Sequence, residues 1–390
     1  MPEKFKADAV FEGGGVKGIA LLGALSVMEE AWSWENVGGT SAGAIVAAFT
    51  ATGMAARDIR RVLDSIDLQE IMDTGWEDRL DWWLSRLSPL RLVSPLGVAR
   101  EHLFSVLKEF GIFEGRRFME LVNDHLPTGK HTFGDLLYDP DAPKDSPYRY
   151  KLRVVASDLT AHRMVVLPQD IVHYGLDPDG LPIAEALRMS MSIPIFFEPW
   201  KLKDTAGRVH HVVDGGILSN YPIWMFDAPP GEEPAWPTFG FDLYSPADKA
   251  DGHPPWPAKL AEINSIFHFG KTVWDTLFSA MDRRYIARRH WARTVAIDGC
   301  GIPTTKFALT PEEKEALWQS GVRAARAFME QWGDPEAGFR RWKAQYRREV
   351  EEAQRLARER RGAFSESSFQ SPHPLLPHAP ALQRTCDRRR

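Results

Sequence analysis

Apolar and polar positions near the start of the chain fall into two repeats of strand, glycine turn and helix. Residues 7–12 predict a short buried strand, and residues 16–31 are mainly apolar and rich in helix-forming residues, which predicts a helix. Residues 35–39 predict a second strand that runs directly into an Ala-rich helix at 44–51, which Gly53 closes. This order of elements predicts a parallel sheet with helices covering its faces.

Later segments extend the same α/β pattern. Four short runs predict further strands: 150–157, 209–213, 238–244 and 293–298. Residues 57–135 and 257–290 are predicted to be mainly helical. The expected fold class is therefore α/β, a three-layer α/β/α domain with a mostly parallel central sheet and a C-terminal helical extension.

The C-terminal part has clear helix signals. Thr310 is a plausible N-cap, Pro311 occupies the first helical position and Glu313 completes a capping box, which predicts a helix as far as Trp332. A second, amphipathic helix is expected at about 336–361, with an apolar stripe that packs on the body of the protein. The expected organisation is a large domain at 1–332, an amphipathic helix at 333–362 and a disordered tail at 363–390.

Composition limits the possible classes of protein. The formal net charge of −5 excludes a globally basic protein that coats nucleic acid. Only two cysteines occur, Cys300 and Cys386, so a disulfide framework is not expected and a reducing, cytoplasmic location fits. The N-terminus has no apolar signal core, and no run approaches the roughly 20 apolar residues that span a bilayer.

The strongest local motif is Gly39-Thr40-Ser41-Ala42-Gly43, between a predicted strand and a predicted helix. This is the context of a Gly-x-Ser-x-Gly nucleophile elbow, in which a sharp turn needs small neighbours. Ser41 would then project at the carboxyl end of the sheet, where open α/β sheets bind ligands. The alternative is a tight turn with no chemistry.

A glycine run opens the first helix: Gly13, Gly14, Gly15, Val16, Lys17 and Gly18. Backbone N–H groups at such a helix start can hold an oxyanion. The run also matches the dinucleotide-binding pattern Gly-x-Gly-x-x-Gly, which requires an acidic residue at the end of the second strand. That strand ends in the elbow motif, and Glu35 lies at its start, the wrong end, so the nucleotide interpretation is disfavoured.

A third motif is Asp214-Gly215-Gly216, a carboxylate at a predicted strand end followed by two glycines. An Asx-turn or a helix-capping aspartate is the alternative. Asp158 also ends a predicted strand, and a Ser–His–Asp triad through His210 or His211 stays open but disfavoured. No cluster has zinc-like or calcium-like spacing, so neither a metal nor a cofactor is expected.

Taken in this order, the three motifs resemble the patatin-like phospholipase family, and the resemblance extends over about residues 7–332. Residues 156–160 and 189–194 also look like family segments. The family commonly has Arg where this chain has Lys17, which keeps the charge but not the planar fork.

The resemblance implies a Ser–Asp dyad without histidine, with Ser41 as nucleophile and Asp214 as base. The backbone N–H groups at about Gly14, Gly15 and Val16 would bind the oxyanion. The implied activity is phospholipase A-type hydrolysis of fatty-acyl esters, most naturally of glycerophospholipids, through an acyl-serine intermediate.

The partners expected are a lipid substrate and a transiently contacted membrane surface, with no nucleic acid. Alternatives are a short-chain esterase or thioesterase, and a non-catalytic binding protein on the same fold. The apolar segment 81–96 is either a mobile cover of the site or, the favoured interpretation, a cap packed on the sheet.

Overall fold

The computed structural model describes residues 3–66, 111–113, 115–229, 232–244, 272, 292–304, 306, 308–348 and 355. Three predictions fall outside these residues. They are the cover at 81–96, the helix at 257–290 apart from Thr272, and the tail at 363–390. Residues 67–110 and 114 of the predicted helical region 57–135, and residues 349–361 of the second C-terminal helix apart from Arg355, also lie outside the described residues.

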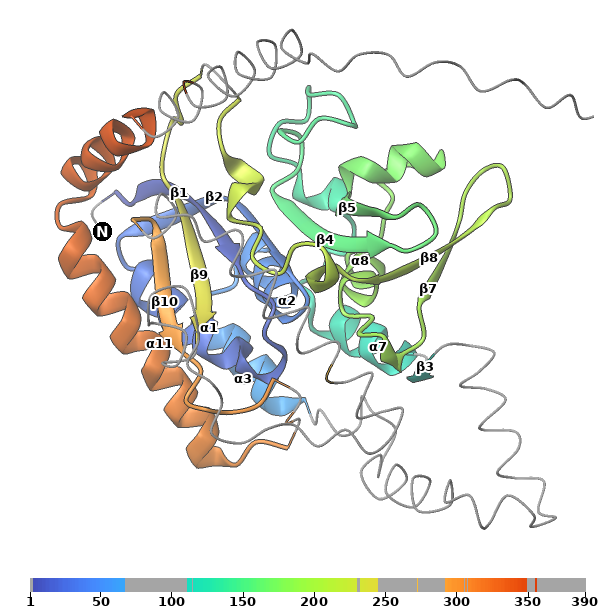
Figure 1. Cartoon of the computed structure of the whole chain (residues 1–390), viewed down its shortest axis with the longest axis horizontal. Helices are drawn as coiled ribbons and strands as arrows, with labels where there is room; N and C mark the ends of the chain where they lie inside the picture. The colour runs from blue at the N-terminus through green and yellow to red at the C-terminus, as the bar shows by residue number, and fades with distance from the viewer. Residues whose placement is uncertain are drawn as a thin grey trace, which may run out of the picture. The chain divides into compact units, whose positions relative to one another are not determined.

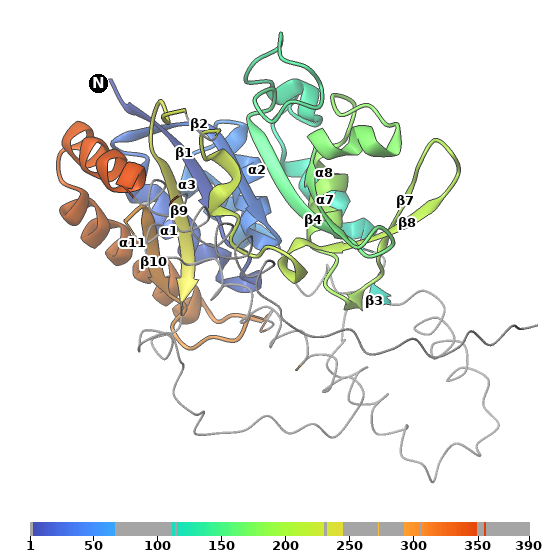
Figure 2. The same cartoon turned by 45° about the horizontal axis from the view of Figure 1, so that its top comes forward.

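The described residues form a central eight-stranded sheet. Along it lie β10 (Thr294–Asp298), β9 (Thr238–Tyr244), β1 (Phe5–Phe11), β2 (Trp32–Thr40), β4 (Leu152–Asp158), β8 (Val209–Asp214) and β7 (Trp200–Lys203), while β5 (Arg163–Leu167) pairs with β4. Figure 1 shows β10 and β9 at one end of the sheet and the β7–β8 hairpin at the other. The same order is seen in the turned view (Figure 2).

Strand direction changes along the sheet. The ladders from β10 through β9, β1 and β2 to β4 are all parallel. Both β5 and β8 run antiparallel to β4, and β7 runs antiparallel to β8. The strands β5 and β7 were not predicted, because each has a pattern of only four or five positions.

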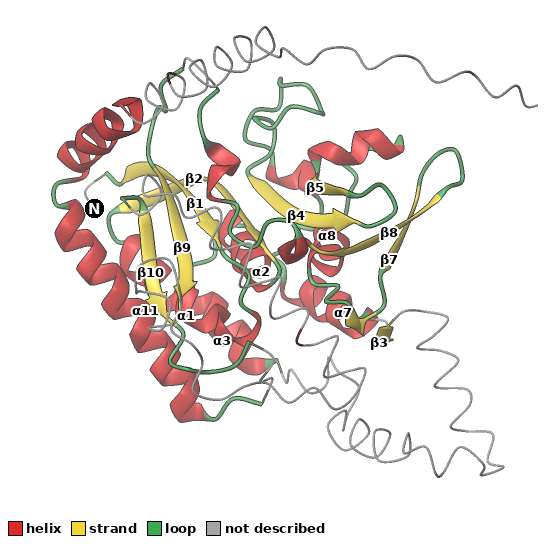
Figure 3. Cartoon of the chain, in the orientation of Figure 1, coloured by secondary structure: helices red, strands yellow, loops and turns green. Residues whose placement is uncertain are grey.

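Helices follow the strands as expected for this fold (Figure 3). They are α1 (Gly18–Met28), α2 (Ala42–Ala51), α3 (Ala56–Ser65), α7 (Arg116–His125), α8 (Ile183–Ser190) and α11 (Pro311–Trp332). Short 3₁₀ segments are η1 (Gly15–Lys17), η2 (Phe133–Leu136), η3 (Gln169–Tyr174), η4 (Gly215–Ile217) and η5 (Ile223–Phe226), and a separate pair is β3 (Gly111–Phe113) with β6 (Ile195–Phe197). The predicted α/β fold with a central sheet and C-terminal helices is confirmed.

Two consecutive glycines of β2 show how the sheet is covered on both faces. A Cβ atom on Gly39 would lie 2.7 Å from the backbone of Gly43 in α2, whereas one on Gly38 would lie 2.4 Å from the sulfur of Met225 in η5. Because successive strand residues face opposite sides, α2 covers one face of the sheet and η5 the other. The close approach explains why neither position carries a side chain.

Helix α11 begins as the sequence predicted. The Thr310 hydroxyl accepts a hydrogen bond from Glu313 N at 3.3 Å, and the Glu313 carboxylate accepts one from Thr310 N at 3.0 Å. Gly333, with a φ of 70°, ends the helix. Residues 335–348 are helical, close to the predicted start at 336, and the buried Trp342 ring lies 5.5 Å from the Arg293 guanidinium.

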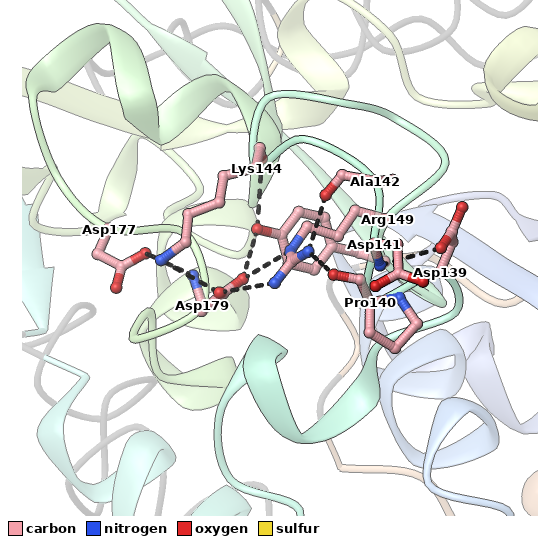
Figure 4. A network of polar contacts seen from close by, with 9 residues as sticks. Asp139, Pro140, Asp141, Ala142, Lys144, Arg149, Asp177 and Asp179 are labelled. Atoms are coloured by element: carbon pink, nitrogen blue, oxygen red, sulfur yellow. Dashed lines mark hydrogen bonds and ion pairs between the residues drawn. The ribbon is translucent and has the colours of Figure 1, made fainter.

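A polar network ties the loop before β4 to the loop before α8 (Figure 4). Arg149 donates to both carboxylate oxygens of Asp179, at 3.0 and 2.9 Å, and the Tyr150 hydroxyl donates to the same carboxylate at 2.8 Å. Lys144 lies 2.6 Å from Asp177 and 3.1 Å from Asp179. The bidentate Arg149–Asp179 pair fixes the orientation of both loops.

Candidate functional site

Ser41 occupies the turn between β2 and α2. Its φ of 54° and ψ of −127° are strained for a residue with a side chain, as expected at a nucleophile elbow. A Cβ atom on Gly43 would lie 2.4 Å from the carbonyl oxygens of both Phe11 and Glu12, so this position requires glycine. The backbone of β1 and the first turn of α2 therefore approach closely behind Ser41, which is 2 % exposed.

Asp214 ends β8 and is fully buried. Its Oδ1 accepts a hydrogen bond from Gly216 N at 2.8 Å. Its Oδ2 is buried, and the described residues offer it no partner at hydrogen-bond distance. Burial raises the pKa of Asp214 to about 7, although the Gly216 amide and the nearby Ser41 side chain both act to lower it.

The register of the sheet explains how two distant residues meet. In β4, Val155 pairs with Thr40 of β2, and the next residue, Ala156, pairs with Asp214 of β8. A Cβ atom on Gly215 would lie 2.4 Å from the Val155 carbonyl oxygen, so the chain can turn there only with glycine. The structure therefore brings the predicted nucleophile and the predicted base together across β4.

In the glycine loop, residues 13–18, some backbone N–H groups donate hydrogen bonds within the protein and others do not. Gly13 N donates to Asn220 O at 3.1 Å, and Val16 N donates to Thr304 O at 3.4 Å. The amides of Lys17 and Gly18 donate back into the loop, to Gly14 O and Gly15 O respectively. Within the described part of the chain, the N–H groups of Gly14 and Gly15 have no acceptor. Two of the three predicted oxyanion donors are thus open, and the third, Val16, bonds to Thr304.

The Lys17 side chain lies against Gly299, just after β10. An added Cβ atom on Gly299 would lie 3.3 Å from Lys17 Nζ, so the lysine side chain extends along the backbone at the end of β10. Gly15 has a φ of 53°, and a Cβ atom there would lie 2.3 Å from Thr304 O. The segment after β10 therefore packs closely on the glycine loop, a contact that the sequence did not predict.

The last residue of α8 and the residues just after it hold both members of the Ser41–Asp214 pair. The buried Ser190 hydroxyl accepts a hydrogen bond from Ser41 N at 2.9 Å and donates to Val155 O at 2.6 Å. Asp214 N donates to Ser192 O at 2.9 Å. Residues 189–194 carried part of the family resemblance, but the sequence assigned them no role. Only the tertiary contacts show that this segment orients the backbones of both residues.

The family model for patatin-like phospholipases matches residues 9–227, which is more than half of the chain. The chain belongs to the patatin-like phospholipase family. Both Ser41 and Asp214 lie within the matched region, together with the whole glycine loop.

Two curated proteins are related to this family member. An uncharacterized protein of Bacillus subtilis, YqhO, is 36% identical over 327 residues, covering 83% of this chain and 98% of the relative. A second uncharacterized protein, R571 of Acanthamoeba polyphaga mimivirus, is 21% identical over 329 residues, covering 82% of this chain and 92% of the relative.

Two solved structures are similar to this family member. VipD from Legionella pneumophila has a TM-score of 0.46 at 17% identity, over 85% of this chain and 67% of VipD. The type III effector protein ExoU has a TM-score of 0.39 at 16% identity, over 84% of this chain and 53% of ExoU.

This family member has a second buried aspartate at a strand end, Asp158 of β4, whose carboxylate is fully engaged. Oδ1 accepts hydrogen bonds from Thr160 N and Ala161 N at 2.8 and 3.0 Å. Oδ2 contacts the Tyr174 hydroxyl at 2.9 Å and His210 Nδ1 at 2.8 Å. The candidate triad histidine His210 is therefore directed at Asp158, and its other nitrogen lies 3.6 Å from Asp204. Likewise His211 N donates to the Thr160 hydroxyl at 2.9 Å.

Two further observations concern membrane and metal sites. Within the described ranges, the helices are too short or too polar for any of them to cross a bilayer. In the same residues, no group of three or more His, Cys, Asp or Glu side chains is arranged to hold a metal ion.

Proposed function

We propose that this protein is a phospholipase A-type serine acyl hydrolase that cleaves fatty-acyl esters of glycerophospholipids. The observation that carries the proposal is the buried Asp214 beside Ser41, with one carboxylate oxygen open and a pKa raised to about 7. A carboxylate with this pKa is half ionised near neutral pH and is a far better base than an aspartate in water. Family membership supports a lipid ester as the substrate.

In the first half of the reaction, Ser41 Oγ attacks the ester carbonyl carbon and its proton passes to Asp214 Oδ2. The negative charge that develops on the carbonyl oxygen is bound by the open N–H groups of Gly14 and Gly15. Donors of this kind contribute about 3–4 kcal/mol each to stabilisation of the transition state. The C–O bond of the ester then breaks, and the proton on Asp214 passes to the leaving lysophospholipid alcohol.

In the second half, water attacks the acyl-serine while Asp214 accepts a proton from it. The same two amides bind the second oxyanion. Breakage of the acyl–Ser41 bond releases the fatty acid, and the proton returns from Asp214 to Ser41 Oγ. No step requires a metal or a cofactor, and a histidine is not needed because Asp214 serves as both base and acid.

The direct test is fatty-acid release from phosphatidylcholine and phosphatidylglycerol vesicles by wild type and Ser41→Ala. Ser157→Ala is a matched control. Ser157 is also a fully buried serine, on β4, and its hydroxyl has no hydrogen-bond partner among the described residues. We expect release by wild type and Ser157→Ala, and none by Ser41→Ala. Equal release by Ser41→Ala would show that Ser41 is not the nucleophile.

A chain-length series of monomeric p-nitrophenyl esters separates the alternatives. Activity confined to short, monomeric esters would favour a soluble esterase or thioesterase over a phospholipase. A wild-type protein that hydrolyses no ester and does not react with a fluorophosphonate would instead be a non-catalytic binding protein. We predict that the enzyme acts from the cytoplasm and touches the membrane surface only transiently.

A further inference from the structure

Asn220 lies six residues after Asp214 and contacts the glycine loop directly. It is 1 % exposed, and its Nδ2 donates hydrogen bonds to Glu12 Oε1 at 2.8 Å and to Gly13 O at 3.0 Å. Its own carbonyl oxygen accepts the Gly13 amide at 3.1 Å. Glu12 Oε1 and Gly13 O are both acceptors, so the NH₂ group of the Asn220 amide, and not its oxygen, must face them. Both peptide units that flank Gly13 are therefore held by one residue.

Because the peptide bond is planar, the hydrogen bond from Asn220 to Gly13 O also affects the direction of the Gly14 N–H. The Gly13 carbonyl and the Gly14 N–H belong to the same trans peptide unit and point in opposite directions. The hydrogen bond from Asn220 to Gly13 O therefore fixes the direction of the Gly14 N–H, which is one of the two open amides. An added Cβ atom on Gly13 would lie 2.3 Å from Asn220 Oδ1, so glycine is needed for the approach.

Glu12 anchors Asn220 to the sheet. Glu12 is 3 % exposed, and its carboxylate accepts hydrogen bonds from Asn220 Nδ2 and from Leu243 N of β9. The preceding residue, Ser219, accepts a hydrogen bond from the Thr40 hydroxyl of the elbow at 2.9 Å. One short segment, residues 214–220, thus supplies the predicted base and contacts both the elbow and the glycine loop.

We infer that Asn220, held by Glu12, is a positioning residue that orients the Gly13–Gly14 peptide so that the Gly14 amide faces the developing oxyanion. This inference rests on the proposed function. Asn220 does not touch the substrate. Its loss frees the Gly13–Gly14 peptide to rotate, which weakens binding of the transition state more than binding of the substrate.

The chain offers a matched control between β1 and β2, away from the glycine loop. Asn36, also buried, donates through Nδ2 to the carboxylate of Asp8 at 2.8 Å, far along the strand from the glycine loop. Both pairs combine a buried asparagine with a buried carboxylate, Asp8 within β1 and Glu12 directly after it. Loss of either pair should lower the melting temperature by a similar amount, because a buried carboxylate loses one donor in each case.

The experiment measures two rates for wild type, Asn220→Ala and Asn36→Ala, well below their melting temperatures. One is the rate at which a fluorophosphonate phosphonylates Ser41, and the other is kcat and KM for p-nitrophenyl butyrate. For Asn220→Ala we expect both the labelling rate and kcat to fall by about 10²-fold or more, with KM changed less than threefold. For Asn36→Ala we expect both rates within threefold of wild type.

Each other outcome has a definite meaning. Near-normal rates for Asn220→Ala, or an equal loss in Asn36→Ala, would overturn the positioning role while leaving the proposed function intact. A wild-type protein that neither labels nor hydrolyses would overturn the proposed function itself. If Asn220→Ala is insoluble, Asn220→Ser against Asn36→Ser gives the same comparison, because serine is too short to reach both Glu12 and Gly13.

Discussion

Asp158 and Asp214 are both buried aspartates at the ends of neighbouring strands, but they differ in how many hydrogen-bond partners surround their carboxylates. Each ends a strand, β4 and β8 respectively, the two strands are hydrogen-bonded neighbours, and both side chains are buried. Asp158 is contacted by two backbone amides, a tyrosine hydroxyl and His210. Asp214 accepts one backbone amide, and its second oxygen has no partner among the described residues.

The difference shows what separates a structural carboxylate from a chemically available one. Both carboxylate oxygens of Asp158 are already occupied by hydrogen-bond partners, so neither is available to a substrate or to Ser41. Asp214 is desolvated without that compensation, so its pKa rises to about 7 and an oxygen stays open beside Ser41. Carboxylates left in this state tend to mark functional sites.

The largest expected effect is on hydrolysis. Asp214→Asn keeps the shape of the side chain but cannot accept the Ser41 proton, so kcat should fall by about 10²–10⁴-fold. Asp158→Asn should retain kcat within tenfold. The measurement is fatty-acid release from phospholipid vesicles, with circular dichroism to confirm that both variants are folded. If a folded Asp158→Asn protein lost as much kcat as Asp214→Asn, the two aspartates would not differ in their importance for catalysis.

Stability should change in opposite directions in the same two variants. Asp158→Asn leaves buried donors facing an amide NH₂, which should lower the free energy of unfolding by about 2–4 kcal/mol. The folded-state pKa of Asp214 lies above the ordinary value of 3.8, so its stabilising contribution is complete below that value and lost as pH rises to about 7. At pH 8 Asp214→Asn should therefore be more stable than wild type, by up to about 4 kcal/mol.

Urea unfolding of the three proteins at pH 8 and pH 4 measures this effect. The increase in the free energy of unfolding caused by Asp214→Asn should vanish at pH 4, because the wild-type carboxyl is then protonated in the folded protein. A gain that is independent of pH would show that the pKa of Asp214 is not raised.

The pH dependence of activity should report the same pKa. Because the ionised form of Asp214 accepts the proton, kcat/KM should rise with pH and level off above about 7. Activity at pH 5 should be about 100-fold below the plateau, since two pH units separate it from that pKa. Initial rates on a monomeric ester avoid changes in the vesicle surface. A profile already flat at pH 5 would assign the base to another group.

The smallest effect concerns a third aspartate, Asp179, in the network of Figure 4. Hydrogen bonds, chiefly from Arg149, lower the pKa of Asp179 to about 2. The stability that it contributes is therefore present above the ordinary value of 3.8 and lost as pH falls towards 2. Asp179→Asn should lower the free energy of unfolding by about 1 kcal/mol at pH 7, as measured with urea. It should leave kcat for ester hydrolysis unchanged. A loss of activity would link these loops to the site.

Much of the fold followed from local patterns. The strand–turn–helix units around β1, α1, β2 and α2 and the capping box at Thr310 depend on residues within one or two turns of each other. The short strands β5 and β7 did not follow, because each is stabilised by pairing with β4 or β8 more than by its own pattern. The roles of Ser190 and Asn220 depend wholly on contacts with distant segments.

The sequence by itself determined that Ser41 stands on a sharp turn between a strand and a helix, because small residues on both sides are a local requirement. It also placed aspartates at the ends of two strands. The family resemblance favoured Asp214 as the base, but only the tertiary structure shows the surroundings of each aspartate: Asp158 contacts Tyr174 and His210, whereas Asp214 lies beside Ser41 with one oxygen open. The physical reason is that the pKa of a buried carboxylate depends on which donors surround it, and these come from parts of the chain far away in sequence.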